Sequence, residues 1–361
     1  MTDLVQVGYN ALRAILQTWQ TDEDEIEFEG QRGERTFGFR WWAGNHEVRV
    51  TAELPQPETE VPWVKIQVIS PVLINVDLTK PGRLELLSSL TPLATSTYAL
   101  QVATSAVPHP DNFRQKSTTL WFSSTAYVTE ETCGWLAPFF AKLALIPVIN
   151  AEISGTNLPQ MIGSGDPAHS RPTSLRGRPH DEILDVVKDV IAPLGQGESR
   201  WSDCPEFEDF AEEWGRSDYC FATGDKSGLS AETPFGSSSA LIRLWSDQDH
   251  PQLGAGLLTT LQLPMTISFD EAATMSSAFN LSEQEAWTGF PLVGAWHAVG
   301  EGDDAGIAFS SFVPNAFYMP GLAGQIAIWM IERARWVREN FYPDLIDDTM
   351  AQILERRFGR L

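Results

Sequence analysis

The sequence predicts an α+β protein made of two tandem domains, each with the element order α-β-β-β-α-β-β-α. Apolar residues alternate with polar ones in several runs, and this period of two marks a strand in a sheet with one buried face. Amphipathic runs of helical period separate the strands. The same order of elements recurs about 187 residues later, where Phe122-Ser123-Ser124 corresponds to Phe309-Ser310-Ser311. Each domain is therefore expected to be an antiparallel sheet packed with helices.

The first domain is expected over residues 1–153. It begins with a helix over residues 3–19, whose apolar residues lie mostly on one helical face. Three strands with alternating apolar residues follow, in "RTFGFRWW", "EVRVTAEL" and "WVKIQVISPVLI". A short helix over residues 84–90, the strands "YALQVA" and "TTLWFSSTAYV", and a helix over residues 130–146 complete the order. Pro138 lies inside that last helix and predicts a kink or a later start.

The second domain is expected over residues 182–342. Its first helix is either residues 181–194 or the stretch "FEDFAEEWGR", and both alternatives remain open. A weak strand or hairpin comes next, and then the strands "SSALIRLW" and "GAGLLTTLQLPM". Ser268, with Glu271 three residues on, forms a capping box that starts the second helix. The strands "LVGAWHAV" and "AGIAFSSFV" precede a helix that opens at Pro320, and residues 343–361 form a last helix outside the repeat.

Residues 154–181 separate the two domains and are rich in Gly, Pro, Ser and Thr. This composition predicts a linker or a surface excursion, together with the extra helix that follows it. The stretch is locally basic in an otherwise acidic chain. A solvated tether is the first interpretation, and docking onto the protein's own acidic surface is the alternative.

The net charge of −23, from 48 acidic and 25 basic residues, restricts the possible partners. Such a charge repels phosphate backbones and anionic lipid headgroups, so neither nucleic acid nor a membrane surface is expected to bind. No apolar run approaches the roughly 20 residues of a membrane span. The N-terminus carries Asp3 and no basic region, which argues against a signal peptide. Because the three cysteines are odd in number and lack CxxC spacing, a disulfide framework is not expected, and the chain is predicted to be cytoplasmic.

Motifs that carry chemistry are weak in this sequence. There is no GxSxG nucleophile elbow and no phosphate-binding loop, and "GSGDPA" in the linker lacks the strand-turn-helix context of a dinucleotide site. The histidines have no HxxxH spacing, and Cys133, at a helix start, has no histidine near it in sequence. We therefore expect no catalytic residue, metal or cofactor. The alternative is an enzyme or small-ligand protein with a site between the halves, gathering His297, Cys220 or several carboxylates.

Tryptophans on one face of the predicted sheets are the candidate binding residues. If the alternating apolar residues face the helices, the other face of the first sheet carries Trp42, Trp63 and Trp121, and that of the second carries Trp245. An exposed sheet face is normally polar, so these side chains need a cover. The cover is either the chain itself or an extended peptide of a partner, for which tryptophan is a strong anchor. Full burial within the chain would contradict the peptide version.

The order α-β-β-β-α-β-β-α resembles the type III secretion chaperone-like fold, including the YbjN-like proteins. The stretch "SSAFNLSEQEAWTGFPLVGAWHAV" is similar to the YbjN-like segment in which an asparagine ends the second helix, and Asn280 and Trp287 would be its marked positions. The resemblance implies a non-catalytic, acidic, cytoplasmic protein that holds extended segments of partner chains. Two tandem copies would form an intramolecular pseudo-dimer, which is compatible with a monomer in solution.

Overall fold

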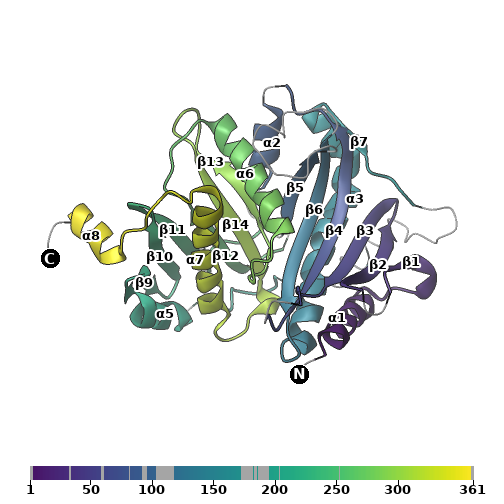
Figure 1. The fold of residues 1–361 in the computed structure, drawn as a ribbon, viewed down its shortest axis with the longest axis horizontal. Coiled ribbons are helices and arrows are strands. Elements are labelled where there is room, and N and C mark those ends of the chain that lie inside the picture. The colour runs from purple at the N-terminus through teal and green to yellow at the C-terminus, as the bar shows by residue number, and fades with distance from the viewer. Residues whose placement is uncertain are drawn as a thin grey trace. The chain divides into compact units, whose positions relative to one another are not determined.

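The computed structural model describes residues 3–31, 34–57, 61–80, 82–91, 96–102, 118–171, 182, 185, 195–202, 204–251 and 253–358. It confirms the α+β class, with two antiparallel sheets accompanied by helices (Figure 1). Contacts divide the chain into two compact units that are not contiguous in sequence. The first unit comprises residues 1–87, 95–191 and 280–293, and the second comprises residues 88–94, 192–279 and 294–361.

The first unit contains a sheet in the order β1-β2-β3-β4-β6-β5, with β7 paired to β4. Its main elements are α1 (Leu4–Trp19), β1 (Ile26–Glu29), β2 (Thr36–Ala43), β3 (His46–Glu53), β4 (Val64–Val76), α2 (Arg83–Ser89, ending in the second unit), β5 (Thr97–Val102), β6 (Thr118–Val128), α3 (Cys133–Ile162) and β7 (Asp166–Pro167).

One face of this sheet packs against α1 and α3. In β3, Val48, Val50 and Ala52 are buried while the residues between them are half-exposed, which is the expected alternation. The indole N–H of the buried Trp19, at the end of α1, donates to the carbonyl of Ala141 in α3 at 2.8 Å. The apolar core of the unit therefore lies between these two helices and the sheet.

The helix α3 is longer than the sequence predicts. It begins at Cys133 and continues to Ile162, past the expected end at residue 146 and into the expected linker. Leu158 and Ile162, four residues apart, are buried, and this helical spacing outweighs the turn-forming composition of the stretch. The following residues do not form a free tether either, since β7 pairs with β4 and the Ala168 amide donates to Val72 at 3.0 Å. Residues 172–181 of the expected linker lie outside the described residues.

The second unit contains a sheet in the order β13-β14-β12-β11-β10-β9-β8. Its main elements are α5 (Glu206–Trp214), β8 (Arg216–Ser217), β9 (Cys220–Asp225), β10 (Gly228–Phe235), β11 (Ser238–Trp245), β12 (Gly256–Gln262), α6 (Phe269–Glu285, ending in the first unit), β13 (Ala295–Val299), β14 (Gly306–Pro314), α7 (Leu322–Phe341) and α8 (Met350–Phe358).

The two sheets share one topology. The run β2-β3-β4-β6-β5 in the first unit corresponds to β10-β11-β12-β14-β13 in the second. The repeated serines take matching places, since Ser123 pairs with Ile69 of β4 and Ser310 pairs with Thr260 of β12. The helix α5 is the described helix that precedes the second sheet. The competing candidate, residues 181–194, lies outside the described residues except for Glu182 and Asp185.

The helices of the second unit, like those of the first, bury apolar residues at helical spacing. In α7, Ile326, Met330 and Ala334 recur at helical spacing and are buried. The guanidinium of Arg333 lies 4.0 Å from the ring centre of Phe309 in β14, which is a cation–π geometry. The last helix, α8, is held to β10 by Arg357, whose Nη1 lies 2.8 Å from Glu232.

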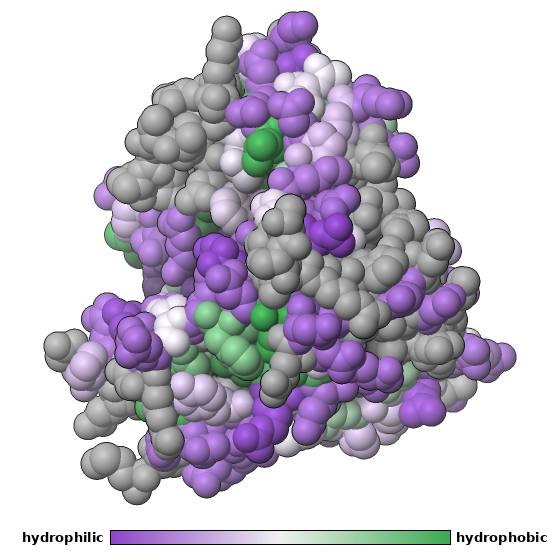
Figure 2. Space-filling model, turned by 90° about the vertical axis from the view of Figure 1, so that its right-hand side faces the viewer, coloured by the Kyte–Doolittle hydropathy of each residue, from purple (hydrophilic) through white to green (hydrophobic). Residues whose placement is uncertain are grey.

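Figure 2 shows one face of the molecule, on which hydrophilic residues predominate and hydrophobic areas are small. This agrees with the large excess of acidic residues. None of the helices in the described part of the chain combines the length and the apolar character that a membrane span requires.

A first prediction concerns the close approach of β2 to β3. A Cβ added at Gly38 would lie 1.9 Å from the Val50 carbonyl oxygen, so Gly38→Ala forces the backbones apart. We expect a loss of about 1–3 kcal/mol of unfolding free energy, measured by urea denaturation. Gly134→Ala is the matched control, because a Cβ there meets nothing within 4 Å. Equal stability of the two variants would contradict this packing.

Candidate binding faces

Each sheet has a second face, here called the outer face, which is the one opposite α1 and α3 in the first unit and opposite α7 in the second. The candidate tryptophans differ in exposure. Trp42 is 1% exposed, so the chain itself buries it and it is not available to a partner. Trp63, Trp121 and Trp245 are each half-buried. The tryptophan pattern thus marks outer faces that are covered to different degrees.

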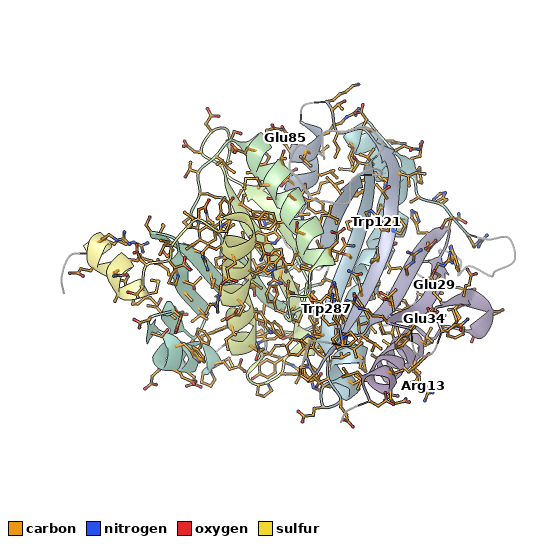
Figure 3. The ribbon with its side chains drawn as sticks, in the orientation of Figure 1. Arg13, Glu29, Glu34, Glu85, Trp121 and Trp287 are labelled. Carbon is orange, nitrogen blue, oxygen red and sulfur yellow. The ribbon has the colours of Figure 1, made fainter. Side chains whose placement is uncertain are left out.

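At β4 and β6, the outer face of the first sheet is occupied by residues 280–293, here called the crossing segment. It comprises the end of α6 and the chain that follows, and it contains Asn280 and Trp287. Trp287 packs near Tyr127 of β6, with ring centres 6.0 Å apart. A Cβ added at Gly289 would lie 3.2 Å from the Trp63 ring. Figure 3 labels Trp287 in this segment and Trp121 on β6.

Several polar contacts of the crossing segment involve its main chain. The ammonium of Lys65 in β4 donates to the carbonyls of Gln284, Glu285 and Ala286 at 2.9, 3.3 and 2.8 Å. These are carbonyls at the C-terminal end of α6, where no further turn of helix supplies donors. The three N–H donors of the ammonium therefore cap the helix and complement the negative end of its dipole.

The extended part of the crossing segment is held in the same way. The Tyr127 hydroxyl accepts from the Thr288 amide at 2.9 Å. Further along, Thr125 of β6 and Leu292 exchange two main-chain hydrogen bonds of 3.0 and 2.9 Å, which form an antiparallel bridge. A segment bound through its carbonyls and amides is recognised by its backbone shape more than by its side chains.

Burial changes the electrostatics of Lys65. Its side chain is 3% exposed, and desolvation lowers its pKa to about 8, against the attraction of Glu53 and Glu285. Burial also raises the pKa of the Glu285 carboxyl, which the nearby Lys65 partly opposes. The ammonium thus holds the crossing segment at an electrostatic cost, because its charged form is disfavoured in the folded unit.

The outer face of the second sheet carries a row of polar side chains in register across five strands. Ser230 pairs with both Thr223 and Arg243, and Thr260 pairs with both Arg243 and Ser310. Residues directly opposite each other on neighbouring strands point to the same face. This polar row therefore consists of Thr223, Ser230, Arg243, Thr260 and Ser310.

Two hollows lie on this face and share Arg243 and Trp245 as lining residues. The larger has a volume of about 360 Å³ and is lined by Thr260, Gln262, His297 and Ser310 among others. The smaller has a volume of about 240 Å³ and lies against the β9–β10 hairpin. The guanidinium of Arg243 lies 5.9 Å from the ring centre of Trp245, so the two side chains stand together between the hollows.

Burial shifts the pKa of His297, which lines the larger hollow. Its Nε2 lies 2.7 Å from the Ser310 hydroxyl, and its Nδ1 lies 3.1 Å from the Ala298 carbonyl. Since a carbonyl only accepts, Nδ1 carries the proton and the Ser310 hydroxyl donates to Nε2. Desolvation lowers the pKa of His297, although the Ala298 hydrogen bond opposes the shift, so the imidazole is neutral near pH 7.

The cysteines do not join this arrangement. Cys220 is buried in β9 and does not line the larger hollow, and burial raises its pKa to about 11. Burial also raises the pKa of Cys133 at the start of α3. Protonated thiols are poor nucleophiles and poor metal ligands. Among the described residues, no cluster of three or more His, Cys, Asp or Glu side chains could hold a metal ion.

Two residues that organise these faces are absent from the sequence-based candidates. Lys65 and Arg243 each stand between two apolar residues of a strand, in "VKIQV" and "LIRLW". A cation within such an alternation is the available signal, but it equally fits a solvated sheet face.

Neither a protein-family model, a curated protein nor a solved structure matches the chain.

The buried ammonium gives a second prediction. Because the pKa of Lys65 falls from 10.5 unfolded to about 8 folded, the unfolded chain binds more protons between these values, and stability due to this group rises with pH. Lys65→Met leaves three carbonyls without their donor and should destabilise by about 1–3 kcal/mol. The difference in unfolding free energy between the wild type and this variant should be larger at pH 9.5 than at pH 7.5, as measured by urea denaturation of both proteins. A difference that becomes smaller as the pH rises would refute the lowered pKa of Lys65.

A third prediction concerns Gly289, whose φ of +79° favours glycine. Gly289→Ala adds both this backbone strain and contact with Trp63, which should loosen the crossing segment. We expect exchange of the Leu292 amide hydrogen to accelerate about tenfold, corresponding to ~1–2 kcal/mol of strain. Gly302→Ala is the control, because its φ of +61° brings the same strain in open space. Unchanged Leu292 exchange in the Gly289 variant would contradict the prediction.

Proposed function

We propose that the chain is a non-enzymatic, cytoplasmic protein of chaperone-like or regulatory type that acts by binding an extended segment of another protein. The single observation that carries the proposal is the crossing segment on the first outer face. There, Lys65, Tyr127 and Thr125 hold a stretch of chain through its carbonyls and amides. This is a binding mode that tolerates many sequences, as a protein that holds partner chains requires.

The second sheet supports the proposal because it has the same strand order. Its outer face presents the half-buried Trp245, the hydroxyls of the polar row and two hollows. Tryptophan and arginine are the side chains that most often dominate binding energy at protein interfaces. The resemblance to type III secretion chaperone-like and YbjN-like proteins belongs to the same proposal, since it implies the same activity.

The chemistry of the described residues supports a binding role over a catalytic one. Ser310 and His297 form a hydrogen-bonded pair on β14 and the edge strand β13, but both residues are at most 4% exposed. The cysteine thiols whose pKa is shifted, Cys133 and Cys220, are held in the protonated form. A small-ligand role remains the second candidate, favoured by the polar lining of the 360 Å³ hollow, whose volume is at the low end for ligand sites.

The fourth prediction tests binding directly with a permanently unfolded probe, reduced and carbamidomethylated α-lactalbumin carrying a fluorescent label. We expect saturable binding in fluorescence anisotropy, and Trp245→Ala should weaken it about tenfold or more because it removes an interface anchor. Trp214→Ala is the matched control, since Trp214 is 39% exposed on α5 and lies outside both hollows.

Two results would overturn the proposal. One is the absence of saturable binding to the wild-type protein. The other is binding that Trp245→Ala and Trp214→Ala weaken equally, which would place the interaction elsewhere. Circular dichroism of both variants shows whether the fold is retained.

A further inference from the structure

Two arginines occupy the same place in the two sheets. Arg49 lies in the middle of β3, within "VRV", and Arg243 lies in β11, within "IRL". Arg49 pairs with Ile69 of β4, which pairs with Ser123 of β6. Arg243 pairs with Thr260 of β12, which pairs with Ser310 of β14. Both arginines therefore project from the outer face, at equal distances along the row from the repeated serine.

In the first unit, carboxylates of the same unit surround this arginine. The Nε of Arg49 lies 3.3 Å from a Glu29 oxygen, and its Nη2 lies 3.3 Å from a Glu47 oxygen. Glu29 also pairs with Arg40 at 2.7 Å. Figure 3 labels Glu29 on β1. The first sheet thus shows which chemistry this position binds, namely one or two carboxylates presented from the outer face.

In the second unit, the matching carboxylates are replaced or used elsewhere. Glu47 stands two residues before Arg49, and the residue two before Arg243 is Leu241. In the first sheet, Glu29 of β1 pairs with Gly38 of β2. In the second sheet, Gly228 of β10 takes the place of Gly38, and it pairs with Asp225 of β9. Asp225 is one methylene shorter than glutamate.

Asp225 is also engaged within the β9–β10 turn. Its Oδ1 accepts from the Ser227 amide and hydroxyl at 2.7 and 2.6 Å and from the Gly228 amide at 3.2 Å. These hydrogen bonds fix the carboxylate in the hairpin. Within the described part of the chain, no carboxylate lies within 4.0 Å of the Arg243 guanidinium.

Arg243 is correspondingly exposed and arranged for an outside ligand. Its guanidinium stands near Trp245 and between the two hollows. The hydroxyls of Ser230 and Thr260 flank it in the polar row. A planar guanidinium can take a carboxylate through two parallel hydrogen bonds, and flanking hydroxyls can take neighbouring backbone groups.

We propose that Arg243 is a carboxylate site, which binds an acidic side chain of the partner's extended segment while a neighbouring apolar side chain of that segment packs on Trp245. This inference rests on the proposed function and names the chemistry of the partner. The overall charge of −23 does not prevent such binding, because surface charges are screened beyond about 8 Å at physiological salt. The acidic partner is therefore selected locally, at an arginine that has no carboxylate partner in the described part of the chain.

The test uses two labelled peptides that differ in one atom group, Ac-STFTETFTSG-amide and the same peptide with glutamine in place of glutamate. Binding is followed by fluorescence anisotropy in about 0.15 M salt. We expect the glutamate peptide to bind about tenfold more tightly, as a charge-assisted hydrogen bond allows. Arg243→Gln should abolish this preference, because the glutamate peptide then has no guanidinium to pair with and binds no more tightly than the glutamine peptide.

A second variant supplies the missing carboxylate from within the chain. Leu241→Glu places a glutamate where the first sheet has Glu47, and it should also abolish the preference by pairing with Arg243. Arg13→Gln is the control, because Arg13 is an exposed arginine on α1 of the first unit, labelled in Figure 3. It should keep the tenfold preference. Thermal unfolding of each variant confirms that the fold is retained.

The outcomes separate this inference from the proposed function. If unfolded α-lactalbumin binds but the two peptides bind equally or not at all, the carboxylate site is refuted and the proposed function stands. If neither α-lactalbumin nor the peptides bind, both are refuted. If N-acetylglutamate displaces the glutamate peptide at concentrations equal to those of the unlabelled peptide, the site recognises a free small carboxylate and the partner assignment is overturned.

Discussion

A sheet has two faces, and in each unit the long helices pack on one of them, α1 and α3 in the first unit and α7 in the second. The rest of the structure follows from how the chain treats the other face. In the first unit, the crossing segment covers the outer face at β4 and β6, and polar groups that it brings with it are satisfied by Lys65, Gln67, Tyr127 and Thr125. In the second unit, the described outer face is instead a polar row with hollows on either side of Arg243 and Trp245. One topology therefore supports a filled and a more open version of the same surface.

The fold class followed directly from hydrophobic periodicity. Alternating apolar residues identified the strands, because the period of two is set by local backbone geometry. The recurrence of the element order along the chain indicated the repeated topology. Element ends were harder to predict. Gly and Thr after residue 153 suggested a linker, but the buried Leu158 and Ile162 continue α3 because their packing outweighs local propensity.

The candidate site was only partly predictable from the sequence. Periodicity placed Trp42 and Trp245 on outer faces, but it carries no information about what covers a face. The cover of the first sheet comes from far along the sequence, since Tyr127 and Thr288 are separated by 161 residues and Lys65 and Gln284 by 219. The roles of Arg49 and Arg243 are similarly invisible, because the sequence shows two equivalent arginines and only the fold shows which one has carboxylates beside it.

The crossing segment also has a consequence for biosynthesis. A ribosome that has made residues 1–191 has produced most of the first unit, yet the chain that closes its outer face ends at residue 293 and is still to be translated. During that interval, Lys65 faces no helix end and the half-buried Trp63 lacks the neighbouring Gly289. The nascent first unit would thus be a transient, incompletely closed intermediate, and its completion waits for contacts of high sequence separation, which form slowly.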